Sequence, residues 1–175
     1  MSRKNTRLTL KKMTTLTVFL AVSLCISLAE SFFPPLVPIP GVRLGLANVV
    51  TLLLLYDFTP GETLLVLLMR ILLSAFCAGQ AMSFVYSLCG GILCFLIMWF
   101  LYRFLCGRFL VLTSIFGALA HNAGQLMAAC LFTGGFSVLA YAPVLVVSGI
   151  LTGCFTGLCA YFTRKYLSPH IKKLF

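Results

Sequence analysis

Long apolar stretches separated by short polar breaks constrain the fold of this chain more than any other feature. A helix needs about 20 mainly apolar residues to cross a bilayer, and a helix satisfies all of its own backbone hydrogen bonds there. The stretches therefore predict an all-α integral membrane protein with six transmembrane helices. The predicted spans cover about residues 13–33, 43–56, 60–78, 82–102, 109–132 and 138–162.

Composition supports the same class of protein. Hydrophobic residues make up 61% of the 175 residues and charged residues only 9%, against about 25% charged residues in soluble domains. We expect one membrane domain (residues 13–163) between a basic head (residues 1–12) and a basic tail (residues 164–175). The net charge of +10 does not predict nucleic-acid binding, because the basic residues lie at helix ends and not on a soluble face.

The basic residues also predict the orientation in the membrane. Six spans place both ends of the chain on one side, where eleven of the thirteen Lys and Arg residues fall. The positive-inside rule identifies this side as the cytoplasm, so we expect a multi-pass protein of a bacterial-type plasma membrane. The first apolar run is longer than the roughly 7–15 residues of a signal peptide core and is interpreted as a span. The two remaining basic residues are Arg43 and Arg70.

A proline-rich break separates the first two spans. Residues 30–48 contain four of the seven prolines and a Gly-Val-Arg turn, with the polar residues Glu30 and Asn48 at their ends. Proline does not continue a helix, and non-helical backbone at membrane depth occurs only where protein or a water-filled cavity covers it. We interpret this segment as the outer lip and lid of a binding site, with a tight external turn as the alternative.

Several polar side chains are predicted to gather beneath this segment. Ionisable residues inside a membrane domain are costly and indicate a functional site. Distances along the helices place Arg70 and His121 near the midplane. The predicted substrate-binding residues are Glu30, Arg43, Asn48, Arg70, His121, Asn122 and Gln125. Their basic excess favours an anionic or strongly hydrogen-bonding small molecule. Alternatively, Arg70 pairs with Glu30 and the fifth span bridges helices only to hold the bundle together.

The chain lacks the motifs of several enzyme classes. No phosphate-binding GxxxxGK[ST] loop occurs, and Asp57 is the only aspartate, so paired aspartates for a Mg²⁺–diphosphate complex are missing. The eight cysteines lie in apolar runs without a CxxC pair, and we interpret them as buried hydrophobic residues. We therefore expect no enzymatic activity, no cofactor and no metal site.

Two local patterns predict helix ends and helix packing. Thr59, Pro60 and Glu62 form a capping box that begins the third span. Small residues at four-residue spacing allow close helix approach. Such stripes are formed by Gly149, Gly153 and Gly157 on the sixth span and by Thr17, Ala21 and Cys25 on the first. The stripe on the first span either packs inside the bundle or docks a separate membrane protein.

Four segments of the chain resemble a known family. They are PGVRLGLANVVTLL (residues 40–53), SLCGG (residues 87–91), GALAHNAGQLMAA (residues 117–129) and PVLVVSGILTG (residues 143–153). These segments are similar to the Gx transporter family, whose members are often labelled heptaprenyl diphosphate synthase component I. The resemblance covers nearly the whole chain after the basic head, and GVRLGLAN and HNxGQ are its specific motifs.

The Gx transporter family is similar in layout to the substrate-binding S components of energy-coupling factor (ECF) transporters. Such a component is a six-helix membrane protein that captures a vitamin-like compound from outside. A transmembrane T component and paired cytoplasmic ATPases power the transport. The resemblance implies the same function here, and it implies that Thr17, Ala21 and Cys25 dock the T component.

Two other functions stay open. The synthase label implies a membrane subunit associated with polyprenyl diphosphate synthesis. Because the chain lacks the aspartate-rich motifs of prenyl synthases, that subunit would be non-catalytic. The remaining alternative is a scaffold in quinone-linked membrane redox metabolism that has no ligand of its own.

Overall fold

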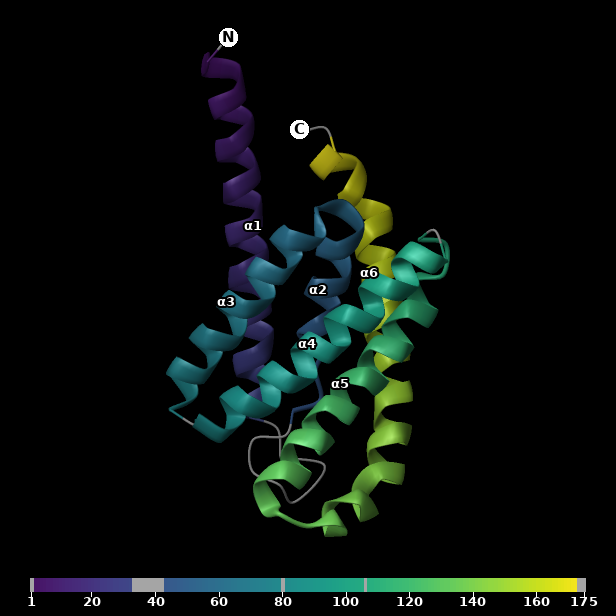
Figure 1. The fold of residues 1–175 in the computed structure, drawn as a ribbon. Coiled ribbons are helices and arrows are strands. Elements are labelled where there is room, and N and C mark those ends of the chain that lie inside the picture. Colours follow the sequence, from purple (N-terminus) through teal and green to yellow (C-terminus); the bar gives the residue numbers. More distant parts are fainter. Residues whose placement is uncertain (1, 33–42, 80, 106, 173–175) are drawn as a thin grey trace.

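The structure, a computed structural model, is that of an all-α membrane protein, as predicted (Figure 1). It describes residues 2–32, 43–79, 81–105 and 107–172. The helices of the described residues are α1 (Ser2–Ser31), α2 (Asn48–Asp57), α3 (Pro60–Ala78), α4 (Ala81–Phe104), α5 (Leu110–Thr133), the 3-10 helix η1 (Phe136–Tyr141) and α6 (Ala142–Lys172). Five of them, α1 and α3 to α6, are long and apolar enough to cross a membrane.

The second helix is shorter than predicted. The predicted span covers residues 43–56, whereas α2 begins at Asn48 and has 10 residues. At 1.5 Å per residue α2 extends for about 15 Å, half of a hydrocarbon core of about 30 Å. Gly45 has a φ of 79°, a left-handed conformation that a regular α-helix excludes. Ala47 and Asn48 are buried, so α2 begins inside the bundle and is preceded by non-helical backbone.

The ends of α3, α4 and α5 agree with the predicted spans to within two residues, whereas α1 and α6 extend beyond their predicted spans at their basic ends. The predicted capping box is confirmed, because the Thr59 hydroxyl accepts from the Glu62 amide and the Glu62 carboxylate accepts from the Thr59 amide. Glu62 also pairs with Lys12 at 2.6 Å, which joins α3 to α1. The basic head and tail continue α1 back to Ser2 and α6 on to Lys172. Figure 1 shows these two ends on the same side of the molecule.

Helix α5 packs against both α4 and α6 at glycine positions. A Cβ atom at Gly124 would lie 2.7 Å from the Cys89 carbonyl oxygen of α4. A Cβ atom at Gly153 of α6 would lie 2.6 Å from the Cα atom of Ile115 in α5. Backbones approach this closely only where no side chain separates them. The predicted glycine stripe of the sixth span therefore serves helix packing.

We expect Gly153→Ala to lower the free energy of unfolding by about 1–3 kcal/mol, because the new methyl group overlaps the α5 backbone. Gly61→Ala is the matched control, since a Cβ atom at Gly61 meets nothing within 4 Å. That control should be neutral or slightly stabilising, because alanine favours helix more than glycine does. Unfolding of the purified protein in detergent measures both variants. A Gly153→Ala variant as stable as the wild type would contradict the close contact.

The cysteines are less buried than predicted. Cys94 is buried, three others are partly buried, and Cys25, Cys77 and Cys89 are exposed. Cys106 lies outside the described residues. The prediction is wrong for the three exposed cysteines because a membrane helix is apolar all around, so an apolar run does not distinguish the protein-facing side from the lipid-facing side.

Candidate functional site

The end of α1 meets the start of α2 in the interior of the bundle. Both oxygens of the Glu30 carboxylate accept backbone hydrogen bonds, from the Gly45 amide at 2.5 Å and from the Leu46 amide at 3.2 Å. Glu30 is only 6% exposed. Buried backbone donors need an acceptor, and a carboxylate is favoured near the positive end of a helix dipole. Glu30 therefore holds the start of α2 against α1.

Arg43 connects the segment before α2 to three helices. Its Nη1 atom donates to the Ser27 hydroxyl of α1 at 2.9 Å and to the Ser74 hydroxyl of α3 at 2.6 Å. These two hydroxyl groups are themselves 3.1 Å apart. The Arg43 backbone amide donates to Oε1 of Gln125 in α5 at 3.3 Å. The guanidinium group of Arg43 thus contacts hydroxyl oxygens of α1 and α3, and its backbone amide contacts a side-chain amide oxygen of α5.

Side chains of α2, α3 and α5 complete this arrangement. Arg70 is 5% exposed and donates through Nη2 to Oδ1 of Asn48 at 3.3 Å. Nε2 of His121 and Nε2 of Gln125 lie 2.9 Å apart and share a hydrogen bond. Six of the predicted site residues therefore lie together. We call the following set the polar cluster: Glu30, Arg43, Asn48, Arg70, His121 and Gln125.

The polar cluster carries more positive than negative charge. The guanidinium groups of Arg43 and Arg70 and the single carboxylate of Glu30 line one small cavity. No ion pair joins Glu30 to either arginine within the described part of the chain, so a direct pair between Arg70 and Glu30 is not formed. Uncompensated charge inside a membrane is costly. The excess of positive charge favours a ligand with anionic or strongly accepting oxygens.

The cavity within the polar cluster is small. Its volume is about 20 Å³, enough for one water molecule, which requires roughly 10–15 Å³. Nδ2 of Asn48 is buried and has no hydrogen-bond partner among the described residues. Buried polar groups are nearly always hydrogen-bonded, so this amide and the two arginines form a set of donors suited to a polar ligand.

Asn122 does not lie with the other predicted site residues. Its Nδ2 atom donates to the Leu145 carbonyl of α6 at 2.7 Å and to the Ser148 hydroxyl at 3.5 Å. Asn122 therefore bridges α5 and α6 and does not line the small cavity. Of the predicted lid, residues 33–42 lie outside the described residues, and its two ends contribute Glu30, Arg43 and Asn48 to the polar cluster.

The predicted docking stripe of α1 lies on its outer face. Thr17, Ala21 and Cys25 are all exposed. The Thr17 hydroxyl donates to the Met13 carbonyl of its own helix. The interpretation of this stripe as an internal packing surface is therefore wrong in the described structure, whereas docking of a separate membrane protein stays a prediction.

The sequence patterns do not single out three residues that build the site: Ser27, Ser74 and Gly45. The two serines accept from Arg43, and the Gly45 amide donates to Glu30. Helical spacing carries a signal for the serines, because Ser27 lies one turn before Glu30 and Ser74 one turn after Arg70. The role of Gly45 depends on its backbone conformation, which no spacing rule reveals.

Comparison with known proteins identifies a family for this chain. The family described as heptaprenyl diphosphate synthase component I matches residues 19–163, which include the whole polar cluster. No curated protein and no solved structure matches the chain. Because the family match covers most of the sequence, the chain belongs to the heptaprenyl diphosphate synthase component I family.

Proposed function

We propose that this chain is a non-catalytic, substrate-binding membrane subunit of an ECF-like transporter. It captures a small anionic or strongly hydrogen-bonding compound at the polar cluster. The observation that supports this most is the excess of positive charge deep in the membrane domain. The chain has no phosphate-binding loop, so a transmembrane T component and cytoplasmic ATPases supply the energy.

The depth of the polar cluster supports a position on a substrate path. Helix α3 rises about 15 Å from Pro60 to Arg70, and α5 rises about 17 Å from Leu110 to His121. Both helices begin on the predicted cytoplasmic side, so these side chains lie near the middle of a core of about 30 Å. Glu30 ends α1 on the opposite side. Ionisable residues at this depth mark substrate pathways in membrane proteins.

Ligand binding requires the polar cluster to open. Its cavity of about 20 Å³ is far below the roughly 300–1,000 Å³ of typical small-molecule pockets. Arg43 is only partly buried, and its guanidinium group lies against the Ser27 and Ser74 hydroxyls. A carboxylate or phosphate group replaces these neutral acceptors favourably, because hydrogen bonds between charged partners are about twice as strong. Arg43 is therefore the residue that first meets the ligand.

Ligands should stabilise the purified protein in detergent against thermal unfolding. A ligand at 100 times its Kd stabilises the folded state by about 2.7 kcal/mol. The compounds to test are flavins, isoprenoid diphosphates, quinone precursors and common vitamins. In the Arg43→Gln variant we expect the ligand-induced shift of the unfolding midpoint to be lost, because the charged donor is gone.

Arg108→Gln is the matched control for this experiment. It removes the same charge from an exposed position between α4 and α5, so it should keep the full ligand-induced shift. Mass spectrometry of small molecules retained by the purified protein identifies the compound directly. The proposal fails if no compound shifts the midpoint of the wild type and no small molecule is retained.

A second function is suggested by the family itself. The description as a heptaprenyl diphosphate synthase component suggests a non-catalytic membrane subunit of such a synthase, because the chain lacks paired aspartates for a Mg²⁺–diphosphate complex. The observation that favours it is the family match over residues 19–163. This function predicts co-purification with a soluble, aspartate-rich synthase that forms product faster when the chain is added. An unchanged rate would exclude it.

A further inference from the structure

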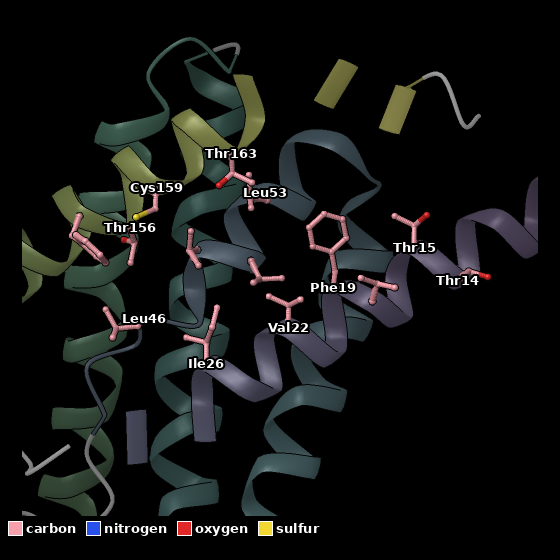
Figure 2. A pocket seen from close by; sticks show the side chains of 14 residues that line it. Thr14, Thr15, Phe19, Val22, Ile26, Leu46, Leu53, Thr156, Cys159 and Thr163 are labelled. Carbon is pink, nitrogen blue, oxygen red and sulfur yellow. The ribbon is translucent and has the colours of Figure 1, made fainter. Parts of the chain in front are cut away.

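A larger cavity opens on the outside of the bundle between α1 and α6 (Figure 2). Its volume is about 620 Å³, and it shares no lining residue with the small cavity of the polar cluster. Its walls are mainly apolar, with Val22 and Ile26 from α1, Leu53 from α2 and Phe155 from α6. Val22 is 46% exposed and Phe155 is 61% exposed, so this surface is accessible from the bilayer. We call it the α1–α6 groove.

The length of the α1–α6 groove corresponds to one leaflet of a bilayer. Along α1 the groove extends from Thr14 to Ile26, which is about 18 Å at 1.5 Å per residue. One leaflet of a hydrocarbon core of about 30 Å is about 15 Å thick. A spanning helix of a partner protein needs the full thickness. The groove therefore fits a hydrocarbon chain of one leaflet better than a spanning helix.

The groove becomes polar toward the side of the molecule that holds both chain ends. Thr14, Thr15 and Thr163 line this end, as Figure 2 shows. Lys11 lies one turn before Thr14 and Thr15, so it shares their face of α1, and it is exposed. The apolar walls thus give way to hydroxyl groups, and the Lys11 cation lies one turn beyond them.

Lys11 differs from the neighbouring cations in its contacts. Lys12 pairs with Glu62 at 2.6 Å, and Arg164 pairs with Asp57 at 3.5 Å. Among the residues whose side chains are described, Lys11 takes part in no ion pair. Its ammonium group is therefore available to an external anion at this end of the groove.

We propose that the α1–α6 groove binds an anionic phospholipid of the cytoplasmic leaflet. One acyl chain lies along the apolar walls, the threonine hydroxyls contact the ester region, and Lys11 binds the phosphate. The order of apolar, hydroxyl and cationic groups along the groove matches the order of acyl chain, ester region and phosphate in such a lipid. Basic residues immediately cytoplasmic of a membrane helix attract anionic lipids. This lipid site is separate from the substrate site proposed at the polar cluster.

Native mass spectrometry of the full chain released from lipid nanodiscs tests the proposal. One set of nanodiscs contains phosphatidylglycerol, which is anionic, and the other contains phosphatidylcholine, which carries no net charge. We expect the protein to retain phosphatidylglycerol and not phosphatidylcholine. Val22→Trp fills the groove and should abolish the retention. Leu73→Trp is the matched control, because Leu73 is 41% exposed on α3 and does not line the groove. This control should keep the bound lipid.

A second pair of variants tests the headgroup contact. Lys11→Gln should weaken phosphatidylglycerol retention about fivefold. One cation near an anionic membrane surface contributes about 1 kcal/mol of binding free energy, which corresponds to this factor. Lys165→Gln removes the same charge at the same end of the molecule, but it lies about 200° around α6 from Thr163. It should leave retention unchanged. The proposal would be overturned if the protein retained both lipids equally or if Val22→Trp still retained phosphatidylglycerol. It would also be overturned if a polyprenyl phosphate or a partner protein displaced the lipid.

Discussion

Replacing Glu30 with alanine is expected to lower the free energy of unfolding by about 3–5 kcal/mol, because two buried amides lose their acceptor and two buried cations lose the nearby negative charge. The carboxylate is the negative group of the cavity that Arg43 and Arg70 also line. It also accepts the amides of Gly45 and Leu46. Its removal leaves two cations uncompensated inside the membrane domain and two donors without an acceptor. Unfolding of the purified protein in detergent measures the loss.

Two variants separate the charge of Glu30 from its hydrogen bonds, and Glu62→Gln is the control. Glu30→Gln keeps one accepting oxygen without the charge, so an intermediate loss is expected. Combining Glu30→Ala with Arg70→Met removes one cation as well, and a double-mutant cycle should give a coupling of about 0.5–3 kcal/mol. Strictly additive losses would contradict the charge argument. Glu62→Gln removes an ion pair with a partly exposed lysine and should cost about 1 kcal/mol or less.

The helical framework can be predicted from the sequence because it depends on local patterns. The capping box begins α3 at Pro60, and the predicted span over residues 60–78 coincides with this helix. The start of α2 depends on contacts between distant residues. The predicted span begins at residue 43, but the Glu30 carboxylate accepts from the Gly45 and Leu46 amides, and the chain becomes helical only at Asn48.

Membership of the polar cluster is easier to predict than its contacts. Counting residues along α3 and α5 brings Arg70 and His121 to a similar depth. The same counting places Asn122 about 100° around the helix from His121. It does not reveal that this side of α5 faces α6, where Asn122 meets the Leu145 carbonyl. Which neighbour a helix face meets is set by the packing of the whole bundle.

The short helix α2 and the segment before it belong to both sites. The Leu46 amide donates to Glu30 in the polar cluster, while Leu46 also lines the α1–α6 groove. Asn48 belongs to the polar cluster, whereas Val49 and Val50 line the groove. A movement of this segment that opens the polar cluster therefore also changes the shape of the groove. Lipid in the groove and ligand in the polar cluster are expected to influence each other.

Gly45→Ala should destabilise the protein by about 2–5 kcal/mol and remove ligand-induced stabilisation. A left-handed backbone costs a residue other than glycine about 1–2 kcal/mol, and Gly45 has a φ of 79°. The new methyl group would also lie 2.8 Å from Nδ2 of Asn48 and 2.8 Å from Cδ2 of His121. Overlap of this kind in a packed interior costs about 1–3 kcal/mol more.

Gly79→Ala is the matched control for this substitution. Gly79 has a φ of 62°, but a Cβ atom there meets nothing within 4 Å. It should therefore show only the conformational cost of about 1–2 kcal/mol. The difference between the two variants in the free energy of unfolding measures how tightly the start of α2 fits against Asn48 and His121. Equal losses would mean that these side chains move aside without cost, and the polar cluster would then not be a tightly packed site.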